Sequence, residues 1–357
     1  MQQTLSQQLS ERVNFAAIII WALRLMVAVV VVWGVVSTLM SGVYSPSQWR
    51  DLVIFGLAQG GVYALIALGY TMVYGILGFI NFAHGEVFMS GMMIGYFVAD
   101  YLNQIGMWNG NPVLALLIVL LVSMATSTTV AVLVERIAYR PLRGSPRIVP
   151  LITSIGASFF IQYAFRGLFG AGVKSYPRME ALQGAVTVLG VRILKVHVLV
   201  IVAALVMMAV LYWFVEKTRT GKAIRAVAED KEIAALMGVD IDRAIVTTFA
   251  IGGLMAGAAG LLYALVFYQV FFFSGFLPGI KAFTAAVLGG IGNIVGAMLG
   301  GFVLGIVESL GPILILSGLG IPAPHQLKDV VAFTVLVLVL IFRPKGLLGE
   351  RLAEERD

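Results

Sequence analysis

The chain has 357 residues, of which 60% are hydrophobic and 12% are charged, and its mean hydropathy is +0.98. Soluble domains carry about 25% charged residues, so this composition excludes an ordinary soluble protein and indicates one that crosses a lipid bilayer several times. The chain has no cysteine and only 3 histidines, far apart in sequence, which excludes disulfides and thiolate chemistry and disfavours a metal site. The formal net charge is +6, and the basic residues lie in short segments between apolar stretches. This pattern orients membrane proteins and does not indicate nucleic-acid binding.

Nine apolar segments are candidates for membrane elements. We predict them at 16–39, 52–74, 86–103, 112–134, 148–169, 196–215, 244–267, 282–311 and 329–342. Because a spanning helix needs about 20 apolar residues, the expected fold is an all-α polytopic membrane protein. We expect about 8–10 transmembrane helices of this length, with broken or re-entrant elements among them.

The first apolar segment belongs to an N-terminal extension, residues 1–50. Its apolar run, Phe15–Met40, is long, contains Arg24, and lacks a small-residue cleavage site before Ser41. These features favour a retained span over a signal peptide. Arg24 lies near one end of the run, so we expect its side chain to reach the membrane interface.

The stretch Gly56–Gly95 is the most informative part of the chain. It is apolar, interrupted by glycines, and has no Asp, Glu, Lys or Arg between Asp51 and Glu86. One helix of this length would overshoot the bilayer, so we predict two helices that meet near His84. Irregular backbone inside a membrane is tolerated only where it is buried in protein or lines a cavity. The junction is therefore the first candidate for a solute pathway.

Three polar residues at this junction are candidates to line the pathway: Asn81, His84 and Glu86. Each has an alternative structural role. Glu86 can cap a half-helix, because a carboxylate is favourable at a helix N-terminus. His84 can be a hydrogen-bonded core residue, and Asn81 can satisfy backbone groups that the break leaves free.

The glycine-rich segment 282–311 is the second candidate for a broken element. It contains GGIGNIVGAMLGG, and its flanking loops are both predicted to be external, so it must begin and end on the outer side. We predict a hairpin or re-entrant pair, with Asn293 as a fourth pathway candidate. One early and one late broken element is typical of transporters. Lys281, Glu308 and Arg166 lie near the ends of predicted spans and are interpreted as interfacial anchors.

Basic loops of membrane proteins tend to lie in the cytoplasm. We place there the loops 135–147 and 216–243, the tail from Arg343 including 350–357, and the N-terminus. The loops 104–111, 268–276 and 317–326 hold no Lys or Arg and are placed outside. The segment 171–195 is basic, but the parity of the spans places it outside as well.

The loop 217–243, KTRTGKAIRAVAEDKEIAALMGVDIDR, is too long for a turn. Its pattern predicts two short helices, the second of which ends at Gly238 because glycine commonly stops helices. Glu232, Ala234 and Gly238 keep an E-x-A-x-x-x-G spacing. A solvated amphipathic connector is the alternative interpretation of this loop.

Five pieces in order resemble one family: YALIALGYTMVYGILGFINFAHGE (63–86), ERIAYRPLRGS (135–145), GKAIRAVAEDKEIAALMGVDIDRAI (221–245), KAFTAAVLGGIGNIVGAMLGG (281–301) and RPKGLLG (343–349). Together they closely resemble the LivH-type permeases of branched-chain amino acid ABC importers, from about Gly56 to Gly349. The pattern is shared with relatives for urea and short-chain amides. The resemblance implies a permease transmembrane domain over 51–349 in a bacterial inner membrane. It also implies a second homologous permease subunit, two cytoplasmic ATP-binding subunits and a periplasmic substrate-binding protein.

The resemblance makes the loop 217–243 the coupling element, with Glu232, Ala234, Gly238 and Val239 as the contact to an ATPase. No G-x-x-x-x-G-K-[ST] phosphate loop occurs in the sequence, so we expect no enzyme and no cofactor bound by this chain. ATP and Mg would be used by the partner subunits, and the permeases would alternate between outward- and inward-facing states. The alternatives are a permease for urea or short amides, and an ion-coupled secondary transporter that uses intramembrane acids such as Glu86 or Glu308.

Overall fold

A computed structural model describes residues 2–146, 148–188, 190–343 and 346–349. Arg147 of the predicted basic loop, two residues of the terminal motif and the predicted tail 350–357 lie outside this description. The described chain is mostly helical and holds eight helices that are long and apolar enough to cross a membrane. This confirms the predicted all-α polytopic class. The short helix α11 and the helix α3 are additional to these eight.

The helices are α1 (Gln2–Ser41), α2 (Pro46–Leu77), α3 (His84–Gln104), α4 (Met107–Gly110), α5 (Pro112–Val134), α6 (Ile148–Phe169), α7 (Lys195–Lys217), α8 (Arg219–Glu229), α9 (Lys231–Leu236), α10 (Ile241–Phe267), α11 (Phe276–Gly289), α12 (Ile294–Gly311) and α13 (Lys328–Phe342). Single π-helical turns extend α5 (Glu135–Tyr139) and α12 (Pro312–Leu316), and 3₁₀ turns occupy Arg140–Leu142, Glu180–Leu182 and Pro324–Leu327. The strands are β1 (Lys174–Ser175), β2 (Ala185–Val188), β3 (Val191–Leu194) and β4 (Gln269–Val270). They form two antiparallel pairs, β1 with β4 and β2 with β3.

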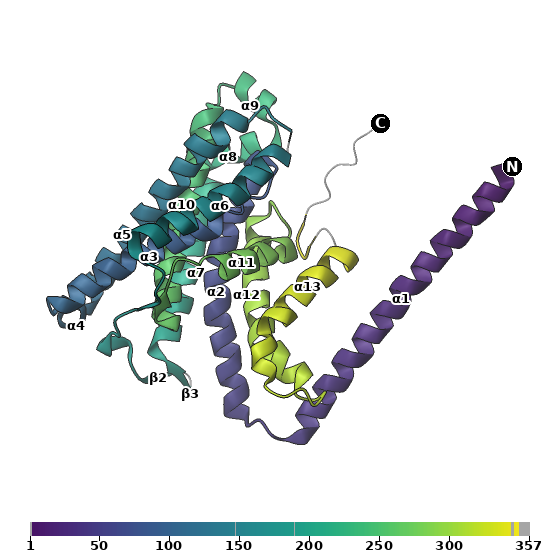
Figure 1. Ribbon diagram of the computed structural model, residues 1–357, viewed down its shortest axis with the longest axis horizontal. Coiled ribbons are helices and arrows are strands. Elements are labelled where there is room, and N and C mark those ends of the chain that lie inside the picture. Colours follow the sequence, from purple (N-terminus) through teal and green to yellow (C-terminus); the bar gives the residue numbers. More distant parts are fainter. Residues whose placement is uncertain (1, 147, 189, 344–345, 350–357) are drawn as a thin grey trace.

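The helix α2 is the centre of the fold, and α10, α11, α12 and α7 pack around it (Figure 1). It starts with a capping box at Ser45, and 72% of its most apolar window is buried. α12 runs antiparallel to α2 at very close range. A Cβ atom on Gly301 would lie 2.4 Å from the Ala64 Cα, and one on Gly305 would lie 2.4 Å from the Gly60 Cα. Glycines therefore permit this approach, as small residues do between membrane helices.

The helices α1 and α13 lie at the edge of the bundle, and only 6% of the apolar window of each is buried. α1 is the extra apolar span predicted in the N-terminal extension. It diverges from the other helices in Figure 1 and packs near its C-terminal end, where Gly34 and Gly318 meet backbone to backbone. The Arg24 guanidinium lies over the rings of Trp21 and Phe342, at 4.9 and 5.0 Å from their centroids. These cation–π contacts stabilise its positive charge.

The two ends of the molecule differ in structure. The short helices α8 and α9 lie at one end, which we call the coupling end, and the β2–β3 hairpin lies at the other, the hairpin end (Figure 1). α7 connects the two, so the segment 171–195 lies opposite the loop 217–243, as parity predicted. The segment 282–311 is a short helix, a turn and a long helix that returns to the hairpin end. Its two helices extend beyond the predicted limits, from Phe276 to Leu316.

Candidate functional site

The predicted break between two helices is present and buried. α2 ends at Leu77 and is capped by Gly78, whose φ of 73° lies in the left-handed region, which glycine adopts without steric strain. α3 begins at His84, and between them lies a short irregular segment. Asn81, His84 and Glu86 are 3%, 2% and 1% exposed. The structure therefore brings these three predicted residues together inside the protein, as irregular backbone in a membrane requires.

Asn81 satisfies backbone and side-chain groups at the break. Its Oδ1 accepts hydrogen bonds from the Tyr139 hydroxyl at 2.5 Å and from the Ala83 amide at 3.1 Å. Tyr139 comes from the π turn after α5, so the bond fixes the break to a second helix. These contacts match the structural alternative for Asn81, a residue that satisfies freed backbone.

Glu86 is held by α6. Its Oε1 accepts hydrogen bonds from the Gln162 Nε2 at 2.7 Å and from the Ser158 hydroxyl at 3.5 Å. Its Oε2 is buried and has no hydrogen-bond partner among the described residues. One turn earlier in α6, the Ser154 hydroxyl accepts from the Phe82 amide at 3.3 Å and donates to the Leu151 carbonyl of its own helix at 2.6 Å, with the Ile80 carbonyl a more distant acceptor at 3.3 Å. Ser154, Ser158 and Gln162 thus form a polar stripe along α6.

This α6 stripe was not predicted, although the sequence contains a signal for it. Ser154, Ser158 and Gln162 are spaced four residues apart within an apolar segment, and that spacing puts them on one helix face. A polar face on a membrane helix needs partners inside the protein, and here the partners are the groups of the break.

His84 packs into a notch in α2. Its ring lies 4.9 Å from that of Tyr70 in an edge-to-face arrangement, and a Cβ on Gly69 would lie 2.1 Å from its Nε2. That nitrogen is buried without a hydrogen-bond partner in the described part of the chain. Gly69 is therefore required for the imidazole to reach its place.

The two broken elements meet. A Cβ on Gly85, at the start of α3, would lie 2.7 Å from the Gly275 carbonyl oxygen and 3.1 Å from the Gly279 Cα of α11. The early and the late broken segments, nearly 200 positions apart in sequence, therefore share one contact at the centre of the fold. The contact is made by the N-cap and first turn of α11, and the pathway role of the two segments stays a prediction.

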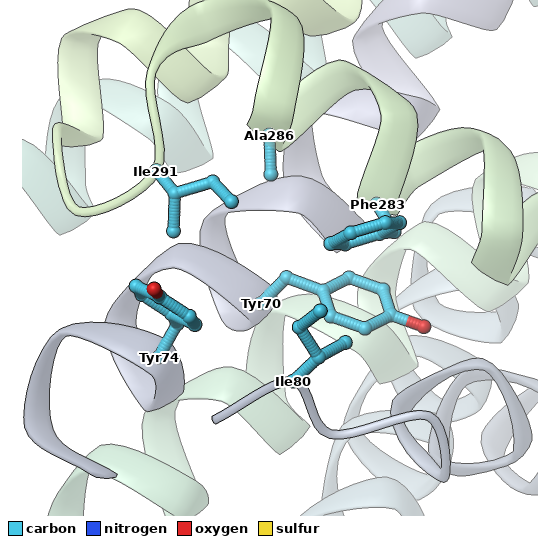
Figure 2. A pocket seen from close by; sticks show the side chains of 6 residues that line it. All are labelled: Tyr70, Tyr74, Ile80, Phe283, Ala286 and Ile291. Atoms are coloured by element: carbon cyan, nitrogen blue, oxygen red, sulfur yellow. The ribbon is translucent and has the colours of Figure 1, made fainter. Parts of the chain in front are cut away.

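A small cavity is lined in part by Tyr70, whose hydroxyl would lie 3.4 Å from a Cβ on Gly279. Figure 2 shows the side chains that line it. Its lining comes from the last turns of α2, the break, α11 and the turn after α11: Tyr70, Tyr74, Ile80, Phe283, Ala286 and Ile291. The cavity measures about 10 Å³, which is about the space that one water needs. The described conformation is therefore closed to an amino acid at this point.

A cluster of charges lies between four helices, with Lys281 and Glu308 buried and Asp329 partly exposed. The Lys281 Nζ of α11 lies 2.6 Å from the Glu308 Oε1 of α12 and 2.5 Å from the Asp329 Oδ1 of α13. The Glu308 Oε1 also accepts from the Gln59 Nε2 of α2 at 3.0 Å, and Gln59 donates to the Tyr63 hydroxyl at 2.5 Å. We call Gln59, Tyr63, Lys281, Glu308 and Asp329 the charged cluster.

The charged cluster corrects the interpretation of Lys281 and Glu308 as interfacial anchors. Their side chains are 5% and 1% exposed, whereas an anchor keeps its charged head in water. Lys281 lies in the middle of α11 rather than at the end of a span. Its charge is neutralised there by acids from two distant segments. Arg166 fits the anchor interpretation better, since it is exposed near the end of α6 and stacks on Tyr163 and Phe272.

Asn293 lies away from the other pathway candidates, in the turn between α11 and α12. Its Oδ1 caps α12 by accepting from the Gly296 amide at 2.8 Å, and its Nδ2 donates to the Leu348 carbonyl at 3.0 Å. Leu347 and Leu348 also donate their amides to Leu288 and Gly289. The side chain of Asn293 is thus used to fix the turn to the terminal GLLG segment, and it does not line the small cavity.

The predicted coupling loop folds into two short helices, as expected. Thr218 caps α8 by accepting from the Gly221 amide at 3.0 Å, and Asp230 caps α9 by accepting from the Glu232 and Ile233 amides at 2.8 and 2.9 Å. α9 ends before Gly238, whose φ is 82°. The loop therefore contains two capped helices, and a coupling element and a solvated amphipathic connector both remain predictions for it.

The four predicted contact residues differ in exposure. Glu232 and Gly238 are exposed, and Val239 is half-buried. Ala234 is only 4% exposed, so its side chain is buried against the rest of the protein. The exposed apolar surface of α9 comes from residues that sequence reasoning did not single out: Ile233, Leu236 and Met237, at 60%, 87% and 79% exposure. We call these three residues the α9 apolar face.

Residues 52–340 match the family model described as branched-chain amino acid transport system / permease component. The chain belongs to this family. The match begins directly after the predicted N-terminal extension 1–50 and includes the break, α8 and α9, and the charged cluster. The chain is thus a permease component of the branched-chain amino acid transport class.

Individual relatives agree with this assignment. The high-affinity branched-chain amino acid transport system permease protein BraD of Pseudomonas aeruginosa is 42% identical over 305 residues, covering 85% of this chain and 96% of that protein. The corresponding protein LivH of Escherichia coli K12 is 39% identical over 297 residues, covering 82% and 93%. A solved structure titled PsaBC from Streptococcus pneumoniae in complex with Fab covers 86% of this chain and 96% of its own, with 10% identity and a TM-score of 0.45. The first two confirm the predicted resemblance and favour branched-chain amino acids over urea or amides.

Proposed function

We propose that this chain is one of two homologous permease subunits in an ATP-driven importer that carries branched-chain amino acids across a bacterial inner membrane. Two cytoplasmic ATP-binding subunits would hydrolyse ATP with Mg, and a periplasmic binding protein would deliver the amino acid. The coupling end would face the cytoplasm, together with both termini. The basic residues of the loop 217–243 support this orientation.

The observation that carries the coupling role is the α9 apolar face. Ile233, Leu236 and Met237 expose large apolar side chains on a helix that Asp230 caps and Gly238 ends. Exposed apolar clusters of this kind mark sites of protein contact. We assign the docking contact with the ATPase to this face, with Glu232, Gly238 and Val239 at its border and Ala234 as the packing residue beneath it.

The contact between the broken elements would be the moving part of the pathway. When the ATP-binding subunits close, α9 would transmit the displacement through α8 and α10, both of which it contacts. α10 in turn packs against α2 and α3, the helices that flank the break. The small cavity at Tyr70 and Phe283 would widen in another state of the cycle, as alternating access requires.

Uptake of labelled solutes tests this proposal. Cells would express the chain with its partner permease, its ATP-binding subunits and its binding protein, and accumulation of labelled leucine and labelled urea would be measured with intact and catalytically inactive ATP-binding subunits. We expect leucine uptake that depends on active ATP-binding subunits. Uptake of urea alone would move the substrate to the amide class, and uptake that is indifferent to the ATP-binding subunits would contradict an ATP-driven importer.

A further inference from the structure

A pocket of about 530 Å³ lies between the first turns of α2 and α7 and the β2–β3 hairpin. Figure 1 shows these elements at the hairpin end. The pocket volume lies in the range of about 300–1,000 Å³ that is typical of small-molecule sites. The small cavity at the break offers far less room, at about 10 Å³. The hairpin-end pocket is therefore large enough for a whole amino acid, whereas the small cavity at the break is not.

Three charged side chains line this pocket: Arg50 and Asp51 from α2, and Arg192 from β3. Among the described residues, no hydrogen bond or ion pair joins any of their charged groups to another residue. Elsewhere in the described chain, Arg140 and Arg143 both pair with Asp242. Asp51 interacts electrostatically with His197 of the same pocket. The two guanidinium groups and the carboxylate line one hollow without an ion pair among them, so they are available to a ligand that carries both signs of charge.

The remaining walls suit an aliphatic group. Ile54 of α2 and Ile193 of β3 line the same pocket, and His197 of α7 adds a polar edge. Small-molecule sites commonly combine apolar walls with a few polar groups that fix orientation. An uncharged amide would use only part of this lining, and so would a purely anionic ligand.

We propose that the hairpin-end pocket is a receiving site for a zwitterionic aliphatic amino acid. Arg192 and Arg50 bind its carboxylate, because guanidinium groups form strong paired hydrogen bonds with carboxylates. Asp51 accepts from its ammonium group, and Ile54 and Ile193 contact its side chain. This inference rests on the proposed function and deepens it, since the pocket lies at the end opposite α8 and α9, where the amino acid would enter.

Ligand analogues that lack one charged group test each contact. The complete importer would be placed in lipid nanodiscs without the binding protein, and the Kd values of leucine, leucinol and 4-methylpentanoate would be measured by ligand-observed NMR. Leucinol lacks the carboxylate and 4-methylpentanoate lacks the ammonium. We expect the Kd of leucine to be lower than that of either analogue by a factor of about ten or more, because each analogue loses a charge-assisted hydrogen bond.

Two substitutions should reduce these preferences separately. Arg192→Gln should lower the preference for leucine over leucinol severalfold, because Arg50 keeps part of the carboxylate contact, and should leave the leucinol Kd unchanged. Asp51→Asn, which keeps the side-chain shape, should abolish the preference for leucine over 4-methylpentanoate. Arg178→Gln is the matched control, because Arg178 precedes the hairpin, stacks on Tyr268 and does not line the pocket. It should leave all three Kd values as in the parent.

The outcomes separate this site from the proposed function. If the parent importer takes up leucine in an ATP-dependent manner, yet Arg192→Gln and Asp51→Asn leave both preferences intact, the receiving site is refuted and the importer function stands. The site is also refuted if these variants only weaken association of the binding protein, measured by pull-down on the same nanodiscs. If a substitution lowers the yield of assembled importer, Arg50→Gln provides a second test of the carboxylate contact, with the same expected loss of preference.

Discussion

The charged cluster should be essential for the stability of the fold, and Lys281→Met tests this most directly. Methionine keeps the length of the lysine's aliphatic stem and removes the charged ammonium group. The Glu308 carboxylate, with a side-chain exposure of 1%, would then retain Gln59 as its donor and lose its counter-ion. Removing one partner of a buried ion pair costs about 3–5 kcal/mol.

Most of this cost should come from Glu308. The Asp329 side chain is 36% exposed, so water can solvate its carboxylate after the substitution and it should contribute little. We therefore expect the free energy of unfolding to fall by about 3 kcal/mol, the lower part of the range for a broken buried pair. Denaturant unfolding of the purified chain in mixed micelles, followed by circular dichroism, measures this change.

Two further variants make the test specific. Lys281→Met combined with Glu308→Gln removes the uncompensated charge and should recover much of the lost stability, because replacing both partners is far less costly than removing one. Lys222→Met, at an exposed site on α8, is the control and should be close to neutral. If Lys281→Met unfolds at the same denaturant concentration as the parent, the charged cluster does not stabilise the fold. If the double variant is no more stable than the single one, an unpaired Glu308 charge is not the cause of the loss.

Three further substitutions test the coupling surface and the break. Leu236→Asp, on the side chain of α9 that is 87% exposed, should leave thermal stability unchanged and lower leucine uptake at least tenfold by disrupting the ATPase dock; normal uptake would remove α9 from the contact. Gly69→Ala should destabilise the chain by about 1–3 kcal/mol through overpacking against His84, whereas Gly75→Ala on the same helix, where nothing lies within 4 Å of the added Cβ, should not; equal thermal shifts would exclude the notch. Glu86→Gln keeps the shape of the side chain that Gln162 contacts, so it should reduce uptake more than assembly with the partner subunits; a parallel loss of both would make Glu86 a structural cap.

The break between α2 and α3 was predictable because its signals are local. A charge-free stretch longer than one span and a glycine before a polar group together fix the position of the junction to within a few residues. The helices α8 and α9 were predictable for the same reason, since Asp230 and Gly238 mark where α9 begins and ends.

The charged cluster could not be predicted from spacing. Lys281 and Glu308 lie 27 positions apart, and no local pattern indicates that two segments will pair. A lone charged residue in an apolar segment indicates the end of a span. A charged residue inside the bundle needs a partner of opposite charge to offset the cost of its desolvation, and that partner can be distant in sequence. The α9 apolar face was missed for a related reason, because the sequence does not state which face of a short helix the bundle covers.

ATP-dependent uptake into proteoliposomes tests the central claim most directly. The purified importer would be reconstituted with its binding protein, and labelled leucine would be followed with ATP and Mg supplied on the side of the ATP-binding subunits. Leucine should accumulate against its gradient, and Leu236→Asp in this chain should abolish the accumulation while the subunits stay associated. Accumulation without ATP, or accumulation that survives Leu236→Asp in full, would contradict the account.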